Sequence, residues 1–128
     1  MDDTSRLKRL LFVCRRDDLR DGGIATRFEI RRGDRQLPAF AVAFAGKVHG
    51  YLNICPHRGT SLDWQPGEVF DETGLYLICA THGALFEPAT GGCIDGPCRG
   101  AGLSPVRLVV QADEVLLADD VRALEPET

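Results

Sequence analysis

Two short stretches of the chain each pair a cysteine with a histidine: C-P-H at residues 55–57 and C-A-T-H at residues 79–82. Each offers one soft thiolate and one imidazole, the side chains that proteins use to bind zinc and iron. A single metal with four ligands could use all four groups. A two-iron cluster could use them too, with both cysteines on one iron and both histidines on the other. The spacing therefore predicts a metal centre formed by Cys55, His57, Cys79 and His82.

Zinc is the main competitor for this ligand set. Zinc modules usually take both cysteines from one knuckle and both histidines from another, in C-x₂₋₄-C and H-x₃₋₅-H spacings. Here the two thiolates come from different loops, an arrangement that suits iron atoms bridged by sulfide. We therefore expect the two-iron cluster, with a colourless structural zinc module as the alternative.

The residues around the ligands narrow the choice further. C-P-H-R-G at residues 55–59 and C-x-x-H-G at residues 79–83 closely resemble the motifs of the Rieske [2Fe–2S] family, over roughly residues 10 to 118. The resemblance implies one [2Fe–2S] cluster per chain, with cysteines on the buried iron and histidines on the outer iron. Several short predicted strands with frequent Gly and Pro between them indicate an all-β fold. The resemblance implies stacked antiparallel sheets, with a small cluster-binding subdomain, at about residues 53–99, inserted into the base.

The resemblance also bears on the reduction potential. High-potential relatives in bc-type complexes carry an extra cysteine in each ligand loop and a Ser and a Tyr shortly after the second histidine. The matching positions here hold Thr60, Ala80 or Thr81, Ala84 and Phe86. Hydroxyl hydrogen bonds to sulfur stabilise the reduced cluster, so their absence predicts a low-potential centre.

Composition predicts a folded globular protein with one domain over residues 1–128. Of its residues, 44% are apolar and 27% charged, and the net charge is −4. The acidic balance argues against nucleic-acid binding and fits a partner with a basic docking face. No apolar run is long enough for a membrane span, and residues 1–6 lack the order of a secretory signal, so we expect a cytoplasmic protein.

Period-two alternation predicts the strands that position the ligands. Bulky side chains at 40, 42 and 44 alternate with alanines at 39, 41 and 43, and a turn at 45–46 leads to a returning strand that delivers Cys55. Further strands are expected at 10–14, 26–31 and 75–78. Residues 106–110 and 115–117 predict a closing hairpin, with Val106, Leu108 and Val110 on its core face.

The remaining cysteines, the third histidine and the tryptophan are expected to be structural. His49 is predicted to face solvent from its strand, Cys14 to be a buried small hydrophobe, and Trp64 to pack near the cluster. Cys93 and Cys98 could form a disulfide, but in a reducing cytoplasm we expect free thiols.

These features predict an electron carrier and not an enzyme. The expected donor is a flavin-dependent reductase, and the expected acceptor is the terminal oxygenase of a ring-hydroxylating system. The chain is not expected to be an oxygenase itself, because that site needs two histidines and a carboxylate, and only one of the three histidines is left over. The alternative is a Rieske small subunit or redox-sensing module of a larger reductase complex.

Overall fold

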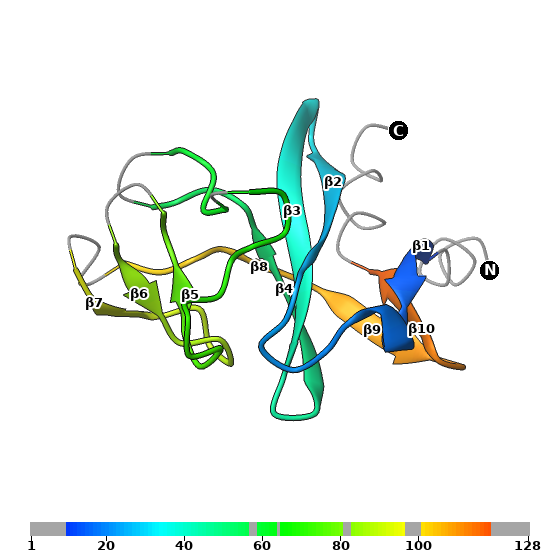
Figure 1. Cartoon of the computed structure of the whole chain (residues 1–128). Coiled ribbons are helices and arrows are strands. Elements are labelled where there is room, and N and C mark those ends of the chain that lie inside the picture. The colour runs from blue at the N-terminus through cyan, green and yellow to red at the C-terminus, as the bar shows by residue number, and fades with distance from the viewer. Residues whose placement is uncertain (1–9, 57–58, 64, 81–82, 97–100, 119–128) are drawn as a thin grey trace.

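The computed structural model describes residues 10–56, 59–63, 65–80, 83–96 and 101–118. In these residues the chain forms β-strands and one short 3₁₀ helix, which confirms the all-β prediction (Figure 1). In order, the elements are β1 (Leu11–Arg15), η1 (Arg16–Asp18), β2 (Thr26–Arg32), β3 (Arg35–Phe44), β4 (Lys47–Leu52), β5 (Leu77–Ile78), β6 (Leu85–Phe86), β7 (Cys93–Asp95), β8 (Pro105–Val106), β9 (Leu108–Gln111) and β10 (Glu114–Leu117). No helix in this part of the chain is long and apolar enough to cross a membrane.

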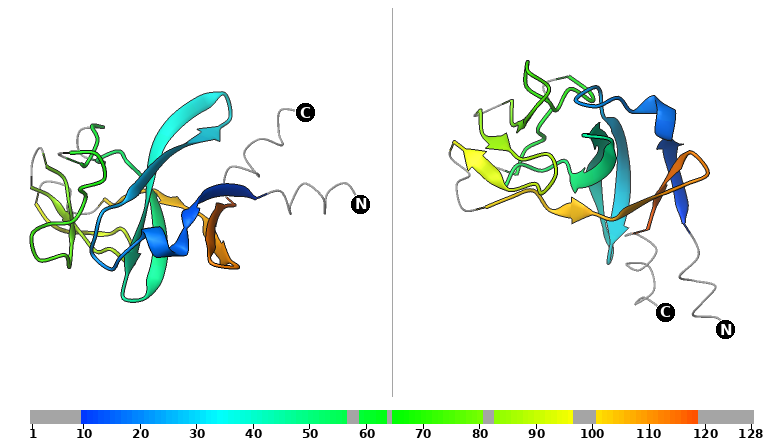
Figure 2. Two further views of the ribbon diagram at one scale, coloured as in Figure 1. Left: turned by 45° about the vertical axis from the view of Figure 1, so that its right-hand side comes forward. Right: turned by 90° about the horizontal axis from the view of Figure 1, so that it is seen from below.

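The strands form three antiparallel sheets. The four-stranded sheet has the order β2-β3-β4-β8, and the two three-stranded sheets have the orders β1-β10-β9 and β5-β6-β7. In Figure 1 the four-stranded sheet lies between the other two, with β5-β6-β7 on its left and β1-β10-β9 on its right, and Figure 2 shows the same order from two other directions. The first cysteine follows a strand of the central sheet, and the second follows a strand of the β5-β6-β7 sheet.

Strand β3 separates two halves of the core. The sequence alternation places Phe40 and Val42 on one face, where they join the apolar cluster that contains both Cys55 and Cys79. The alanines at 39, 41 and 43 lie on the other face and pack with buried side chains of β10. Small residues on this second face let the β1-β10-β9 sheet approach closely, so both faces of β3 are buried.

The β3–β4 hairpin brings the chain to the first cysteine as predicted. Its two turn residues, Ala45 and Gly46, have φ values of 52° and 80°, which match the primed turns that favour the natural twist of a hairpin. The turn pairs Phe44 with Lys47 and fixes the register of the hairpin. The amide of Asn53 then donates to the carbonyl of Pro38 at 2.9 Å, so the pairing continues to two residues before Cys55.

The closing hairpin differs from the prediction in one respect. Val106 belongs to β8 and pairs with β4, whereas β9 begins at Leu108 and pairs with β10. The chain therefore changes sheets at Arg107, and the three residues expected on one core face do not share it. Val106 is buried, Leu108 is half-buried, and Val110 is 46% exposed because β9 is the edge strand of its sheet.

The strand before the second cysteine is also shorter than predicted. Only Leu77 and Ile78 are in β5, and Leu75 is 53% exposed. The amide of Leu75 donates to the hydroxyl of Thr73, which in turn donates to the carboxylate of Asp71. This local turn uses a backbone donor that a longer strand would have given to the ladder.

Candidate metal centre

The loop after β4 is closed by two backbone hydrogen bonds around Cys55. The amide of Cys55 donates to the carbonyl of Thr60, and the amide of Gly59 donates to the carbonyl of Cys55, both at 2.7 Å. The cysteine thus holds the loop at both its donor and its acceptor. These bonds fix the backbone of Cys55 on both sides of its peptide unit.

The loop after β5 repeats this pattern around Cys79. The amide of Cys79 donates to the carbonyl of Ala84 at 2.9 Å, and the amide of Gly83 donates to the carbonyl of Cys79 at 2.7 Å. Each bond joins the same sequence offsets as in the first loop. The chain therefore presents two locally equivalent loops, each with its cysteine at the base.

The glycines of both loops have a left-handed backbone. Gly59 has φ 77° and Gly83 has φ 73°. Among the described residues, no atom lies within 4 Å of a Cβ built at either position, so the backbone conformation, and not crowding by these residues, calls for glycine. The glycine in each predicted motif thus has a defined structural role.

Cys55 and Cys79 are fully buried at 0% exposure and belong to the same apolar cluster. The cluster also contains Phe40, Leu62 and Phe86 from three different parts of the chain. Neither cysteine is in a disulfide. The structure thus brings together two of the four predicted ligands, in surroundings from which water is excluded.

The second cysteine is held by the β5-β6 pairing. Leu77 pairs with Phe86 and Ile78 pairs with Leu85, so β5 and β6 enclose the second loop as a short hairpin. The amide of Ile78 donates to the carbonyl of Val69 at 2.8 Å, which ties the residue before Cys79 to the preceding segment. Cys79 is therefore carried on a scaffold fixed on both sides.

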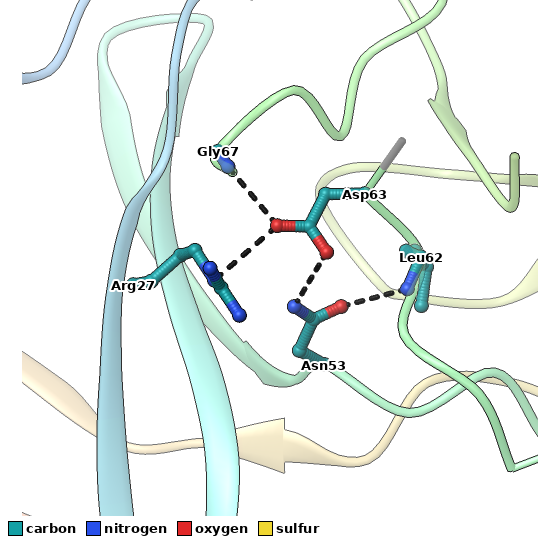
Figure 3. Close-up of polar contacts among 5 residues, drawn as sticks. All are labelled: Arg27, Asn53, Leu62, Asp63 and Gly67. Atoms are coloured by element: carbon teal, nitrogen blue, oxygen red, sulfur yellow. Dashed lines mark hydrogen bonds and ion pairs between the residues drawn. The ribbon is translucent and has the colours of Figure 1, made fainter. Parts of the chain in front are cut away.

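A backbone and side-chain link joins the two loops through Leu62. The amide of Leu62 donates to the Oδ1 of Asn53 at 2.8 Å, as Figure 3 shows. The carbonyl of Leu62 accepts from the amide of Ala80, the residue after Cys79, at 3.0 Å. The end of β4, the first loop and the second loop are therefore connected in series.

The carboxylate of Asp63 extends this link to β2 of the four-stranded sheet. Its Oδ1 accepts from the Nδ2 of Asn53 at 3.0 Å, and its Oδ2 accepts from the amide of Gly67 at 3.0 Å. The Nε of Arg27 on β2 lies 3.3 Å from the same Oδ2, as Figure 3 shows. The Asp63 side chain is only 4% exposed, so three donors compensate the burial of this carboxylate.

Sequence reasoning assigned no role to these polar residues. The contacts that Asp63 makes with Asn53 and Arg27 join residues far apart in the sequence. The only available signal was an asparagine two positions before the first cysteine, at the end of a strand whose other predicted core positions are apolar. Spacing alone could not show that Asn53, Asp63 and Arg27 meet.

The other two predicted ligands, His57 and His82, lie outside the described residues, as do Trp64 and Cys98. Within the described ranges, no group of three or more His, Cys, Asp or Glu side chains could hold a metal ion. The structure thus supplies the two thiol positions of the predicted centre and leaves its histidine positions as predictions.

The expectation of free thiols near the third loop is wrong for Cys93, which is disulfide-bonded. The other described cysteines, Cys14, Cys55 and Cys79, are free. Cys93 is partly exposed at the start of β7, and its residue pairs with Phe86 of β6. The expectation came from an assumed reducing compartment. Pairing instead depends on which cysteines the fold brings together, and the spacing in the sequence does not show this.

His49 is half-buried and does not face solvent freely, which also differs from the prediction. It lines a cavity of about 260 Å³ together with residues of β8, because β8 packs along this end of β4. Burial lowers the pKa of His49, and the nearby Lys47 lowers it further. Cys14 is buried as predicted, and burial raises the pKa of its thiol.

Two of the positions relevant to the reduction potential, Ala84 and Phe86, are buried and carry no hydroxyl. Ala84 and Phe86 are both 0% exposed, and the carbonyl of Ala84 accepts from Cys79. Neither side chain can donate a hydrogen bond to sulfur. Thr60 and Ala80 occupy positions at which high-potential relatives carry their extra cysteines, and both residues are exposed.

The chemistry of the described donors fits an iron–sulfur centre. Thiolates are the preferred ligands of such clusters, and a dry apolar surround is one of the features that tune them. Two buried cysteines on equivalent loops, outside any disulfide, provide both. Together with the histidine of each motif, the donor set has the two-Cys, two-His composition expected for the cluster.

One curated relative shares sequence with part of the chain. It is the oxidoreductase NdmD of Pseudomonas putida, 38% identical over 55 residues, which are 43% of this chain and 8% of that protein. The matched segment thus spans less than a tenth of the relative's length.

Solved structures share the fold more widely. The ferredoxin of carbazole 1,9a-dioxygenase from Nocardioides aromaticivorans IC177 is 23% identical, with a TM-score of 0.65, covering 86% of this chain and 97% of that chain. A complex of reduced oxygenase and oxidised ferredoxin in carbazole 1,9a-dioxygenase matches with a TM-score of 0.66 and 23% identity, covering 87% and 94%. The sequence-family model of the Rieske [2Fe–2S] domain matches residues 9–118. The chain therefore belongs to this family, whose cofactor is a [2Fe–2S] cluster.

Proposed function

We propose that Cys55, His57, Cys79 and His82 hold the [2Fe–2S] cluster and that the protein carries single electrons. The observation that carries this proposal is that two loops with the same hydrogen bonds bury Cys55 and Cys79 among one group of apolar side chains. When bound, such a cluster accepts and releases one electron. The chain's own part is to hold the thiolates away from water, while the histidine of each motif supplies a neutral ligand.

The partners that we propose are a flavin-dependent reductase as donor and a terminal oxygenase as acceptor. The structure of an oxygenase with its ferredoxin supports this pairing, because the present fold covers 94% of the matched chain. The net charge of −4 suits a partner with a basic docking face. Such partners would place the protein in the cytoplasm, which cell fractionation tests.

We further propose a low reduction potential. The buried Ala84 and Phe86 offer no hydroxyl to the sulfur atoms, so one means of stabilising the reduced cluster is missing at these positions. The expected midpoint lies toward the negative end of the roughly −150 to +300 mV range of two-His, two-Cys centres. A strongly positive midpoint in protein-film voltammetry would contradict this.

A second candidate function is a Rieske subunit or redox-sensing module of a larger reductase complex. The local match to the oxidoreductase NdmD favours it, because the segment that resembles this chain there makes up only 8% of a much longer protein. A subunit would copurify stably with a large enzyme, whereas a carrier would be isolated alone and exchange between partners.

The test begins with the purified protein produced with adequate iron. Reduction by dithionite should give the electron paramagnetic resonance spectrum of a Rieske centre, and a colourless protein containing only zinc would overturn the ligand proposal. Stopped-flow mixing with a reductase and then with an oxygenase should show rapid reduction and rapid reoxidation. A cluster that forms but exchanges electrons with neither partner would overturn the carrier proposal alone.

A further inference from the structure

We propose that Asn53 and Asp63 form a positioning pair that sets the relative placement of the two cluster-binding loops. The inference rests on the proposed ligand set, since it concerns loops that carry Cys55 and Cys79. Neither residue is proposed as a ligand. Their contribution is to join the first loop, the second loop and the four-stranded sheet in one series of polar contacts. Figure 3 shows the part of this series that runs from Arg27 to Leu62.

Asn53 has a unique orientation in this series. Its Oδ1 must face the amide of Leu62, which is a donor, and its Nδ2 must face the carboxylate of Asp63, which is an acceptor. An amide flip would break both bonds, so the side chain is locked. Asn53 is only 1% exposed, so water cannot replace either hydrogen-bond partner.

Leu62 transmits this constraint to the second loop. Its amide is fixed by Asn53, and its carbonyl accepts from the amide of Ala80, next to Cys79. Moving the Leu62 peptide would therefore move or release the backbone on which the second thiolate is placed. In the described residues, this path runs from the end of β4 to the second ligand loop.

Asp63 anchors the same series on the opposite side. Its Oδ2 accepts from Gly67, and the carbonyl of Gly67 accepts from the amide of Ala25 at 2.8 Å, just before β2. A Cβ built on Gly67 would lie 2.8 Å from the carbonyl oxygen of Ala25, so the turn lies directly against the base. The ion pair with Arg27 adds a second attachment to β2.

The first test replaces the carboxylate by an amide of the same shape. In Asp63→Asn, one side-chain atom becomes a donor, yet every partner of Asp63 is a donor: Asn53 Nδ2, Gly67 N and Arg27 Nε. Either orientation of the new amide leaves a donor facing a donor. We expect cluster loss in the presence of a chelator to be about tenfold faster or more, as for other partners outside the ligand shell, and altered g values in the reduced protein.

The matched control is Glu29→Gln on the same strand as Arg27. It also removes one negative charge, but Glu29 is exposed and its oxygen accepts only from Gln36 in the bonds described. We expect its spectrum and its rate of cluster loss to match those of the unsubstituted protein. This control separates the hydrogen-bond pattern from a general effect of charge.

The decisive variant exchanges the two side chains, Asn53→Asp with Asp63→Asn. The new aspartate can accept from the backbone amide of Leu62 and from the side-chain Nδ2 of residue 63. The side-chain oxygen of residue 63 can then accept from Gly67 N and from Arg27 Nε. Each hydrogen bond is restored with one donor and one acceptor. We expect the exchanged protein to recover the g values and to lose its cluster within about twofold of the original rate, whereas a bulk packing role predicts no recovery.

Each outcome bears on the proposal. Wild-type cluster retention and spectra in Asp63→Asn overturn it, as does an exchanged protein no better than the single variants. If a single variant fails to accumulate folded while the exchanged one accumulates with the original spectrum, the proposal is supported equally. Absence of a Rieske spectrum in the unsubstituted protein overturns the ligand set and this inference together, whereas failure of electron transfer alone leaves the pair's role intact.

Discussion

The amide of Gly83 donates to the carbonyl of Cys79 at 2.7 Å, and the corresponding glycine of the first loop makes the same bond to its cysteine. The bond requires the chain to turn back on itself within four residues. The left-handed φ of 73° at Gly83 provides this turn. The glycine is therefore part of what holds the thiolate in position.

We predict that Gly59→Ala and Gly83→Ala each lower the free energy of unfolding by about 1–2 kcal/mol, the usual cost of a left-handed residue with a Cβ. No described atom lies within 4 Å of either Cβ, so we assign the cost to the backbone conformation. The relaxed loop should also release the cluster faster. Denaturant unfolding and loss of visible absorbance with a chelator measure the two effects.

Gly46→Ala is the matched control for these variants. Gly46 has φ 80° and an equally open Cβ position, but it lies in the β3–β4 turn, away from both cysteines in sequence. It should cost similar stability and leave the rate of cluster loss unchanged. Equal cluster loss in all three variants would mean that the loop glycines act only through global stability.

Removal of either thiolate should abolish the centre. We predict that Cys55→Ala and Cys79→Ala are isolated without the visible absorbance of the cluster, because each removes one of the two proposed cysteine ligands. Cys14→Ala is the control, since Cys14 is 5% exposed and packs in a different apolar cluster. It should keep the colour and lose about 1 kcal/mol of stability from the small cavity. A coloured Cys55→Ala protein would refute the proposed ligand role.

Much of the scaffold could be predicted because its signals are local. The alternation around Phe40 and the turn at Ala45 and Gly46 fix a hairpin from neighbouring residues alone, and the structure confirms it. The motif glycines likewise reveal a backbone requirement at their own positions. These features depend on a few adjacent residues, which the sequence displays directly.

The sequence-based predictions were wrong or incomplete where contacts between distant segments decide whether a residue is buried or paired. Val106 pairs with β4, and Val110 is exposed on an edge strand, although both fit one alternating run. The half-burial of His49 depends on β8 lying beside it. The Asn53–Asp63 pair requires the loop to fold back onto the end of β4, and no periodicity signals such a contact.

Tyr51 should make stability depend on alkaline pH. Its hydroxyl donates to the carbonyl of Pro88 at 2.7 Å, and burial, with Glu87 adding to it, raises the pKa from 10.0 to about 12. A raised pKa in the folded state means that the neutral form is favoured, so this stability is complete below pH 10 and is lost as the pH rises toward 12. Urea unfolding of the unsubstituted protein should show this loss.

Tyr51→Phe isolates that contribution. Below pH 10 the variant should be about 1–2 kcal/mol less stable, because the Pro88 carbonyl loses its buried donor. Between pH 10 and 12 the difference should shrink, because only the tyrosine protein has a hydroxyl to ionise. A constant difference across this range would mean that Tyr51 ionises equally in the folded and unfolded states.

A hydroxyl beside the second loop should raise the reduction potential. Ala84 is fully buried, follows the loop glycine Gly83, and accepts the amide of Cys79. In Ala84→Ser the new hydroxyl has no water to bond and can donate to sulfur, which favours the more negative reduced state. A net hydrogen bond of about 1 kcal/mol corresponds to roughly 40 mV for one electron, measurable by protein-film voltammetry. Val115→Thr is the control, because it buries a hydroxyl in the core on the other face of β3. It should leave the midpoint potential unchanged. Equal shifts of the midpoint in both variants would show that a hydrogen bond from residue 84 to sulfur is not the cause.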